Sequence, residues 1–301
     1  MTALLDAVRR HAKVHADESG IGRTPVPGLT TVRATAPSGL AYAVSRPLVC
    51  LVVQGAKHVT MGAQDFMFSA GDSLLITADM PMTSQITRAS ESAPYLAVVL
   101  ELDVGLVAEL AAQMGAVGVA APVPARIDRT EMEVADTALR LMLLLDRPAA
   151  VPVLGAQLVR EMHYWLLTGR HGTTIQQLGW STTPLGRVAR AIAMLRTDFA
   201  RPLRVECLAE VSGMSLSSFY HHFRVATSLS PLQFQKQLRL IEARRLMTED
   251  HMPASRAAFA VGYESVPQFT REYGRMFGLP PGRHVREARC GEPGPLGRLF
   301  R

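Results

Sequence analysis

Two segments in the C-terminal part of this 301-residue chain repeat each other about fifty residues apart. The first spans residues 208–223 and the second spans residues 257–273. Gly213 aligns with Gly262, and after one inserted residue the serine and aromatic positions stay in step. Each copy has the pattern of a short helix, a glycine-centred turn and a second helix. The repeat therefore predicts two helix-turn-helix units, a motif whose second helix can enter the major groove of DNA.

The turns and caps of both copies follow the same physical logic. Gly213 and Gly262 stand where the chain must turn, because glycine adopts positive φ at the least cost. Ser215 and Ser265 are predicted to cap the second helices, and Gln268 adds the S-x-x-Q form of a capping box. The aromatic pairs expected to face the core, because they are spaced four apart, are Phe219 with Phe223 and Phe269 with Tyr273.

The outward positions of each second helix are candidates for contact with DNA. In the first copy they are Ser217, Ser218, Tyr220, His221 and Arg224. In the second copy they are Val266, Pro267, Gln268, Arg271 and Arg275. Arginine and glutamine form bidentate contacts with guanine and adenine, each worth roughly 1–3 kcal/mol of discrimination. We therefore predict base readout by Gln268 and Arg271, and phosphate contacts by Arg224 and Arg275.

The net charge of +6 is unevenly placed along the chain. Residues 181–301 hold 18 Lys and Arg against 10 Asp and Glu, whereas residues 1–180 hold 14 against 16. A basic half joined to a nearly neutral half fits a domain that binds a polyanion. Charge alone is equally consistent with a solvated, arginine-rich surface.

The three cysteines, Cys50, Cys207 and Cys290, form no C-x-x-C pair, so they indicate neither a zinc knuckle nor a disulfide framework. This usage fits a reducing compartment. The N-terminus lacks the apolar run of a signal peptide. No apolar stretch approaches the roughly 20 residues that span a bilayer. The chain is therefore expected to be cytoplasmic.

Catalytic and cofactor chemistry have little support in the sequence. The strand-rich region contains one histidine, His58, and no H-x-H pair, so no metal or other cofactor is expected. The chain also lacks a phosphate-cradling loop and a nucleophile-elbow motif, so it is not expected to be an enzyme. Cys50 lies in an apolar strand, where a buried inert thiol and a redox or electrophile sensor both remain open.

The pattern along the chain predicts a strand-rich half followed by a helical half. Between residues 29 and 102, short β-branched runs alternate with turn signals, which is typical of a small barrel or jelly roll. The runs read as strands are 40–44, 48–53, 58–61, 73–77 and 95–102. The helices expected from apolar periodicity are 3–16, 104–114, 129–145, 154–167, 185–195 and 231–247.

Residues 185–286 resemble the DNA-binding domain of the AraC/XylS family of transcription regulators. The segments that carry the resemblance are Leu208–Glu210, Gly213–Ser215, Phe219 with Phe223, Ser230–Pro231, Arg239–Leu240, Ala243–Leu246, Val261–Tyr263, Ser265, Gln268–Tyr273, Phe277–Gly278 and Pro281. In that family two helix-turn-helix units, joined by a long helix, enter consecutive faces of the major groove. The resemblance places that helix at residues 231–247.

The family's base-contacting positions fall on two sets of residues here. The first set, which contains no Arg, Lys, Asn or Gln, is Ser217, Ser218, Tyr220 and His221. The second set is Val266, Pro267, Gln268 and Arg271.

The N-terminal half resembles the cupin-type domain of a subset of AraC-like regulators. The segments that carry this resemblance are Pro27–Leu29, Arg33, Arg46–Pro47, Val53–Gly55, Ala70–Asp72 and Pro81. The resemblance implies effector sensing or dimerisation. It also implies an α+β chain, with a cupin-like β-barrel and flanking helices before an all-α double helix-turn-helix domain. The expected parts are residues 1–170, a linker at 171–184, a DNA-binding domain at 185–290 and a disordered tail at 291–301.

The partners expected from these observations are promoter DNA, a small-molecule effector, a second copy of the chain and, for an activator, RNA polymerase. Two other functions are weighed against this one. An architectural DNA binder would show little sequence preference and a steep dependence on salt. An enzyme carried in the barrel would need chemistry that the motifs do not supply.

Overall fold

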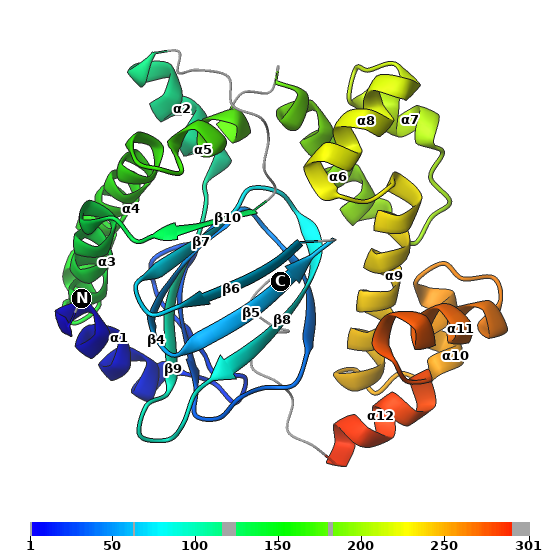
Figure 1. Ribbon diagram of the computed structural model, residues 1–301, viewed down its shortest axis with the longest axis horizontal. Coiled ribbons are helices and arrows are strands. Elements are labelled where there is room, and N and C mark those ends of the chain that lie inside the picture. The colour runs from blue at the N-terminus through cyan, green and yellow to red at the C-terminus, as the bar shows by residue number, and fades with distance from the viewer. Residues whose placement is uncertain (1, 63, 116–124, 180–182, 291–301) are drawn as a thin grey trace. The chain divides into compact units, whose positions relative to one another are not determined.

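The computed structural model describes residues 2–62, 64–115, 125–179 and 183–290. The chain divides after Gly186 into two compact units (Figure 1). The first unit contains all the described strands and the second is helical. The tail expected to be disordered, residues 291–301, lies outside the described residues.

The N-terminal unit is built on two antiparallel sheets. The six-stranded sheet has the order β1-β2-β9-β4-β7-β10, and the four-stranded sheet has the order β3-β8-β5-β6. The strands are β1 (Ile21–Arg23), β2 (Leu29–Ala34), β3 (Ala41–Ser45), β4 (Leu48–Gln54), β5 (Ala56–Met61), β6 (Gln64–Ser69), β7 (Asp72–Ile76), β8 (Met80–Arg88), β9 (Tyr95–Glu101) and β10 (Ala125–Arg129). The arrangement is a cupin-like jelly roll of two sheets, and not a barrel closed by a single sheet.

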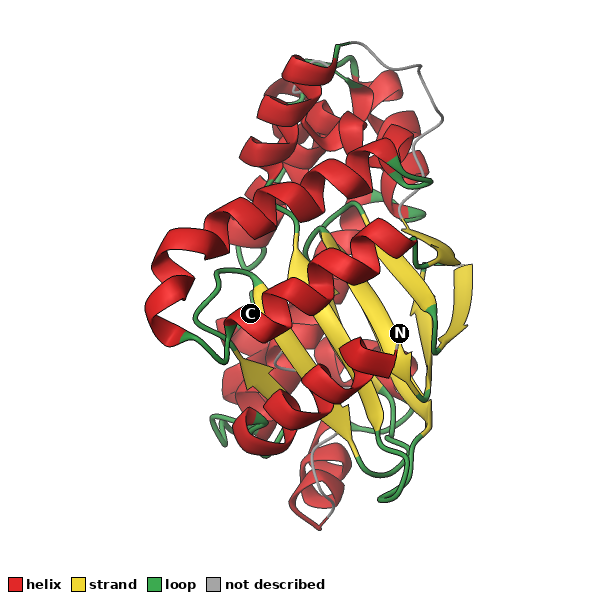
Figure 2. Cartoon of the chain, turned by 90° about the vertical axis from the view of Figure 1, so that its left-hand side faces the viewer, coloured by secondary structure: helices red, strands yellow, loops and turns green. Residues whose placement is uncertain are grey.

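The core of this unit lies between the two sheets. In β5 buried and half-buried residues alternate, and the buried side chains of Lys57, Val59 and Met61 face inward. In β4 and β9 nearly every residue is buried, because helices cover the outer face of the six-stranded sheet. Helix α1 (Thr2–His15) lies across β2, β9 and β4, as Figure 2 shows. This burial on both faces explains why the sequence of these strands is continuously apolar.

The described part of the N-terminal unit also contains the α-helices α2 (Val104–Met114), α3 (Met132–Leu144), α4 (Val151–Thr168) and α5 (Gly172–Gly179). A short 3-10 helix, Pro148–Ala150, joins α3 to α4. No single described helix is long and apolar enough to cross a membrane. The bent pair Met132–Leu144 and Pro148–Thr168 meets the length and composition criteria only jointly, across a 117° bend.

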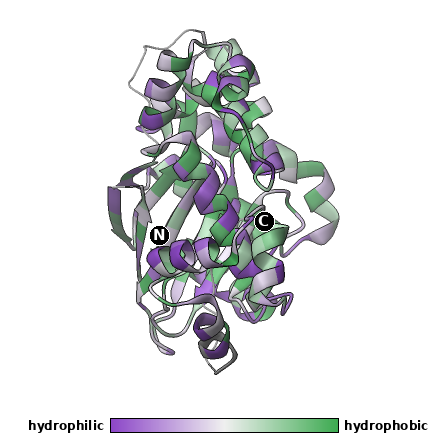
Figure 3. Cartoon of the chain, turned by 90° about the vertical axis from the view of Figure 1, so that its right-hand side faces the viewer, coloured by the Kyte–Doolittle hydropathy of each residue, from purple (hydrophilic) through white to green (hydrophobic). Residues whose placement is uncertain are grey.

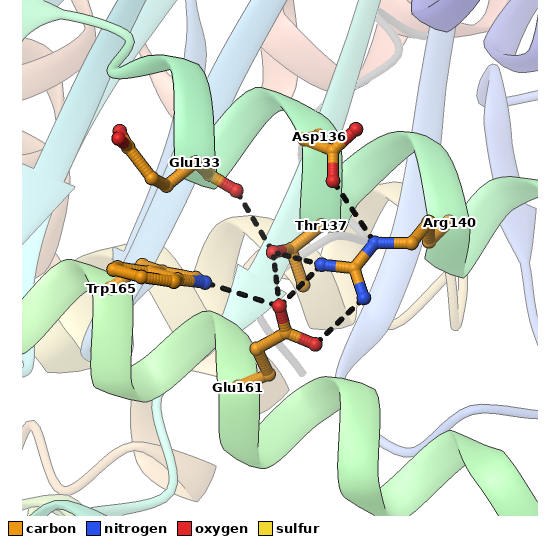
Figure 4. A network of polar contacts seen from close by, with 6 residues as sticks. All are labelled: Glu133, Asp136, Thr137, Arg140, Glu161 and Trp165. Carbon is orange, nitrogen blue, oxygen red and sulfur yellow. Dashed lines mark hydrogen bonds and ion pairs between the residues drawn. The ribbon is translucent and has the colours of Figure 1, made fainter.

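A polar network fastens α3 to α4 (Figure 4). Arg140 donates to both carboxylate oxygens of Glu161 and, at 3.0 Å, to Asp136. The Trp165 indole also donates to Glu161, at 3.1 Å. These hydrogen bonds, foremost those from Arg140, lower the pKa of Glu161 although partial burial opposes the shift. The carboxylate therefore stays ionised and holds the two helices together.

The structure differs from the sequence prediction at several places: strands β1, β2, β6 and β8 were not predicted, and two further differences concern residues 125–184. The helix expected from residue 129 begins at Met132, because residues 125–129 pair with β7 as an added edge strand. The segment 171–184, expected to be a linker, contains helix α5, which packs against α2 and α4. The two glycines and several polar residues of this segment predicted a linker, whereas the helix is stabilised by packing against elements distant in sequence.

The C-terminal unit consists of seven helices within the described residues. They are α6 (Pro184–Asp198), α7 (Val205–Val211), α8 (Leu216–Thr227), α9 (Pro231–Thr248), α10 (Ala254–Ala260), α11 (Val266–Phe277) and α12 (Pro281–Cys290). Hydrophilic and hydrophobic positions alternate along these helices in Figure 3, as expected when one face of each packs inward. Helices α7–α8 and α10–α11 form the two helix-turn-helix units, and the long helix α9 joins them.

Aromatic clusters form the centres of the two helix-turn-helix units. In the first, Phe219 and Phe223 are fully buried, and Phe223 meets Phe234 of α9 edge to face. In the second, Phe269 and Tyr273 are fully buried, with ring centroids 5.4 Å apart. The spacing of four residues places each pair on one helix face, as predicted.

Candidate nucleic-acid interface

The two glycine turns have the same backbone geometry. Gly213 and Gly262 have φ of 59° and 86°. The amide of Gly213 donates to the carbonyl of Glu210 at 2.8 Å, and the next amide donates to Ala209 at 3.0 Å. The same two bonds recur in the second turn, each at 3.0 Å. This is the Schellman ending of a helix, which favours glycine at the left-handed position.

Serine side chains cap the N-termini of both second helices. Ser215 accepts from the backbone amide of Ser218 and Ser265 from that of Gln268, each at 3.4 Å. The capping box expected at Ser265 is incomplete, because the Gln268 side chain donates to Glu272 at 3.4 Å instead of returning to the cap. The complete box lies at the start of α9, between Ser230 and Gln233.

The outward positions of α8 carry hydroxyl, imidazole and one guanidinium group. Ser217, Tyr220, His221 and Arg224 are exposed, and Ser218 is half-buried. The side chain of Arg224 makes no hydrogen bond or ion pair with any described residue. The outward face of α8 therefore offers the guanidinium of Arg224 and several short polar groups.

The outward positions of α11 are richer in cationic groups. Pro267, Gln268, Arg271 and Arg275 are exposed, and Val266 is half-buried. Arg271 and Arg275 lie four residues apart, on one helix face. Neither side chain makes a hydrogen bond or ion pair with any described residue. Their donors are therefore available to an anion or a base edge.

Glu272 is an acidic residue on α11 that the sequence analysis did not single out. Its carboxylate accepts from Lys236 of α9 at 2.9 Å and from the Tyr263 hydroxyl at 2.8 Å. Partial burial acts to raise the pKa of Glu272, but these hydrogen bonds outweigh it and lower the pKa. The negative charge is thus paired within the protein, which reduces its repulsion of a polyanion.

Lys57 is a second group that the sequence analysis missed. Its side chain is buried between the sheets among Phe68, Met82 and Tyr95, and no described residue pairs with it. Burial lowers the pKa of the Lys57 amine to about 8. The adjoining cavity, which Cys50 also lines, measures about 10 Å³, room for roughly one water molecule. The sequence signal that could have identified Lys57 is its place at an alternate, inward-facing position of a strand.

Ser73, His171 and Asp128 meet where α5 begins. The Ser73 hydroxyl lies 3.1 Å from His171 Nε2, and His171 Nδ1 lies 3.5 Å from an Asp128 carboxylate oxygen. These are the residue types of a hydrolytic triad. However, Ser73 and His171 are 2% and 4% exposed, so a substrate cannot reach the hydroxyl in this structure. The hydrogen bond between Ser73 and His171 fastens the start of α5 to β7, whereas His171 Nδ1 has no hydrogen-bond partner among the described residues.

The fold defines a two-domain protein with a jelly-roll domain and two helix-turn-helix units, a motif class that places its second helix in the major groove of DNA. Residues 25–174 match the family described as AraC-type transcriptional regulator N-terminus, and residues 208–287 match a helix-turn-helix domain. The chain belongs to the AraC family of transcription regulators.

The chain is similar in sequence to known regulators and similar in fold to a protein of known structure. The activator RhaS of Escherichia fergusonii is 29% identical over 103 residues, which cover 34% of this chain and 37% of RhaS. The regulator GbdR of Pseudomonas aeruginosa is 28% identical over 107 residues, covering 36% of this chain and 28% of GbdR. These matches span well under half of each relative. Fatty acid-bound ToxT of Vibrio cholerae shares the fold, with a TM-score of 0.55, 9% identity, and coverage of 86% of this chain and 93% of ToxT.

Proposed function

We propose that this protein is a cytoplasmic, sequence-specific transcription regulator that binds promoter DNA through α8 and α11. The observation that carries the proposal is the exposed pair Arg271 and Arg275 on a capped helix of a helix-turn-helix unit, with donors that no described residue occupies. Free guanidinium groups at such a position suit guanine and phosphate recognition. The relatives are regulators and not enzymes, which supports a role without catalysis.

Roles divide among the ten predicted DNA-facing residues. Arg271 and Gln268 read bases, and Gln268 exchanges its bond with Glu272 for one with a base. Arg224 and Arg275 hold phosphates. The short polar groups of α8, Ser217, Ser218, Tyr220 and His221, position the first unit and add weaker readout, while Val266 and Pro267 contact apolar base surfaces.

The test is fluorescence anisotropy of the protein on a duplex from immediately upstream of its gene, with a scrambled duplex as the control. We expect the protein to bind its own site at least about a thousandfold more tightly than the scrambled duplex, as specific regulators usually do. If no duplex, including those selected from a random pool, binds more tightly than the scrambled one, the proposal is wrong. A steep salt dependence would then favour the architectural alternative.

The N-terminal unit, in this proposal, responds to a small molecule that has a carboxylate and an apolar body. Lys57 supports this, since its buried amine has no hydrogen-bond or ion-pair partner in the described part of the chain and is enclosed by apolar side chains and the Cys50 thiol. The shared fold of fatty acid-bound ToxT is consistent with such a ligand. Because the present cavity is water-sized, entry of the ligand requires Phe68 and Met82 to move.

We expect Lys57→Met to raise the stability of the protein at pH 7, because it removes an unpaired amine from the interior. Below pH 8 the amine is protonated in both the folded and unfolded states, so the full cost of burying the charge is present. Above pH 8 the folded state releases the proton, while the unfolded state keeps it to near 10.5. The advantage of the variant in unfolding free energy should therefore narrow by about 2 kcal/mol between pH 7 and pH 9.5.

Urea unfolding of both proteins at the two pH values measures this difference. An advantage that does not change with pH would show that the Lys57 amine is solvated. The same pair of proteins tests the ligand: saturated and unsaturated monocarboxylic acids should raise the melting temperature of the wild type and not that of Lys57→Met. An equal rise in both proteins would place the acid elsewhere.

Self-association through α3 and α4 is also proposed. Leu143 and Leu154 are each 43% exposed and Val153 is 65% exposed, beside a groove of about 690 Å³ between these helices. Sedimentation equilibrium should show a dimer that Val153→Lys weakens, and a wild type that stays monomeric at tens of micromolar would contradict it. If the protein is an activator, the promoter-bound form contacts RNA polymerase, which in vitro transcription measures.

A further inference from the structure

A cluster on the inner side of α9 joins the two helix-turn-helix units. Gln235 donates from Nε2 to the carbonyls of Phe199 and Arg201, at 3.0 and 2.7 Å. One turn further along, Arg239 donates to the carbonyls of Phe199, Ala200 and Arg201, at 2.7, 3.3 and 3.1 Å. Three successive carbonyls of the loop between α6 and α7 are thus held by two side chains of the joining helix.

The same Arg239 guanidinium also reaches the second unit. Its Nη1 donates to the carbonyl of Gly262, in the turn between α10 and α11, at 2.9 Å. The loop and this turn meet directly, since a Cβ atom at Gly262 would lie 1.9 Å from the carbonyl oxygen of Ala200. One planar group therefore binds both the loop that leads into the first unit and the turn of the second unit, from the helix that joins the two units. We call Gln235, Arg239 and the four carbonyls the clasp.

The loop held by the clasp is fixed to the first recognition helix through α6. Arg187 and Arg190 of α6 both donate to the carbonyl of Ser212, in the turn before α8, at 2.8 and 3.3 Å. On the other side, Gly262 lies in the turn directly before α11. The clasp therefore binds the turn before α11 directly, and it is connected to the turn before α8 through helix α6 and its two arginines.

The guanidinium suits this task better than a point charge would. Its donors lie in one plane at fixed angles, so four carbonyl acceptors can be satisfied only in one relative placement. Arg239 is half-buried and has no carboxylate partner among the described residues within salt-bridge distance, so its bonds go to the backbone. Rotation of one unit against the other would break several of these bonds at once.

We propose that Arg239 is a positioning residue that sets the spacing of the two groove segments the protein accepts, without itself touching DNA. This inference rests on the proposed function, since it assumes that α8 and α11 both read DNA. One inserted base pair moves the second segment by roughly 3.4 Å and turns it by about 35°. A rigid pair of units cannot follow this change, whereas a loosened pair can.

The test begins with duplexes selected from a random pool by the full-length wild type, which yields a site with two segments. Affinity is then measured for that site and for derivatives with one base pair inserted or removed between the segments. For the wild type we expect the changed spacing to weaken affinity by roughly thirtyfold or more, because the displaced segment loses at least one good base contact. For Arg239→Met, which keeps the length of the side chain and removes its donors, we expect about tenfold weaker binding to the selected site and a spacing penalty below about threefold.

The matched control is Arg245→Met on the same helix. Arg245 pairs with Glu242 at 2.7 Å and Asp250 at 3.0 Å and not with the clasp, so this variant should keep the wild-type spacing penalty. Melting temperatures are recorded first, and if Arg239→Met is unfolded at the assay temperature, Gln235→Leu replaces it as the milder clasp variant.

A clasp variant that loses affinity equally for all spacings has only a structural defect, which would overturn the inference. A wild type indifferent to spacing would overturn it as well. A wild type that selects no preferred sequence contradicts the proposed function instead, so the two failures are distinguishable.

Discussion

Gly262→Ala is expected to destabilise the second helix-turn-helix unit by about 3 kcal/mol or more and to abolish specific DNA binding. Two costs add at this position. The backbone has φ of +86°, which L-residues rarely adopt, and the added Cβ would lie 1.9 Å from the carbonyl oxygen of Ala200. Because the clashing atom belongs to the backbone, the turn or the loop must move. That movement also separates Gly262 from Arg239.

Alanine substitutions at three other glycines distinguish the cost of the positive φ from the cost of the steric clash. Gly278 has φ of +77° and free space around it, so alanine there should cost about 1 kcal/mol. Gly274, within α11, has free space and an ordinary helical backbone, so alanine should gain up to about 1 kcal/mol. At Gly213 the new Cβ would meet the flexible end of Arg187 at 3.1 Å, so its cost should fall between those of Gly278 and Gly262.

Differential scanning calorimetry of the full chain measures this series. The transition of the C-terminal unit is the one that added duplex DNA shifts upward. We expect Gly262→Ala to lower it by more than about 10 °C, given that 1 kcal/mol corresponds to several degrees in a unit of this size. A shift no larger than that of Gly278→Ala would show that the contact with Ala200 relaxes without cost.

Arg271→Ala should weaken binding to the selected site by roughly 5- to 150-fold, the value of one bidentate base contact. Binding to random DNA should fall much less, since there the side chain supplies only charge. The structure sharpens this expectation, because Arg271 is exposed and has no partner among the described residues. Its full hydrogen-bonding capacity is therefore free for the base.

Arg245→Ala is the comparison for Arg271→Ala. The Arg245 guanidinium is bound by Glu242 and Asp250, and hydrogen bonding to Glu242 foremost raises its pKa. Its loss should change both affinities slightly and to a similar degree. Anisotropy titrations on the selected and scrambled duplexes measure all four values. If both substitutions weaken binding to both duplexes equally, Arg271 does not read a base.

The sequence predicted much of the fold because local patterns carry it. Strands β4 and β9 and helices α4 and α9 follow from runs of apolar residues and from their period. Strands β1, β2, β6 and β8 were not predicted either, and the edge strand β10 and helix α5 were missed because their stabilising partners, β7 and α2, are distant in sequence. Short polar segments of this kind gain their structure from packing and not from intrinsic propensity.

The candidate interface was predictable to the level of helix faces. The glycine turns, serine caps and aromatic pairs lie within about sixteen consecutive residues, so their spacing alone places Arg224, Arg271 and Arg275 on outward positions. Which arginines keep their donors free was not predictable. Arg239 and Arg245 stand on the same helix, yet one binds backbone carbonyls and the other binds carboxylates.

By itself, the sequence determined that this protein contains two helix-turn-helix units, because each unit is encoded by neighbouring residues with a helical period. It could not distinguish Gly213 from Gly262, which align in the repeat. Only the tertiary structure placed the backbone of Ala200 against one turn and a flexible arginine against the other. Only the tertiary structure, likewise, enclosed the Lys57 amine between two sheets, where no described residue forms a hydrogen bond or ion pair with it. Both outcomes depend on contacts between residues far apart in the chain, which folding creates and local spacing does not record.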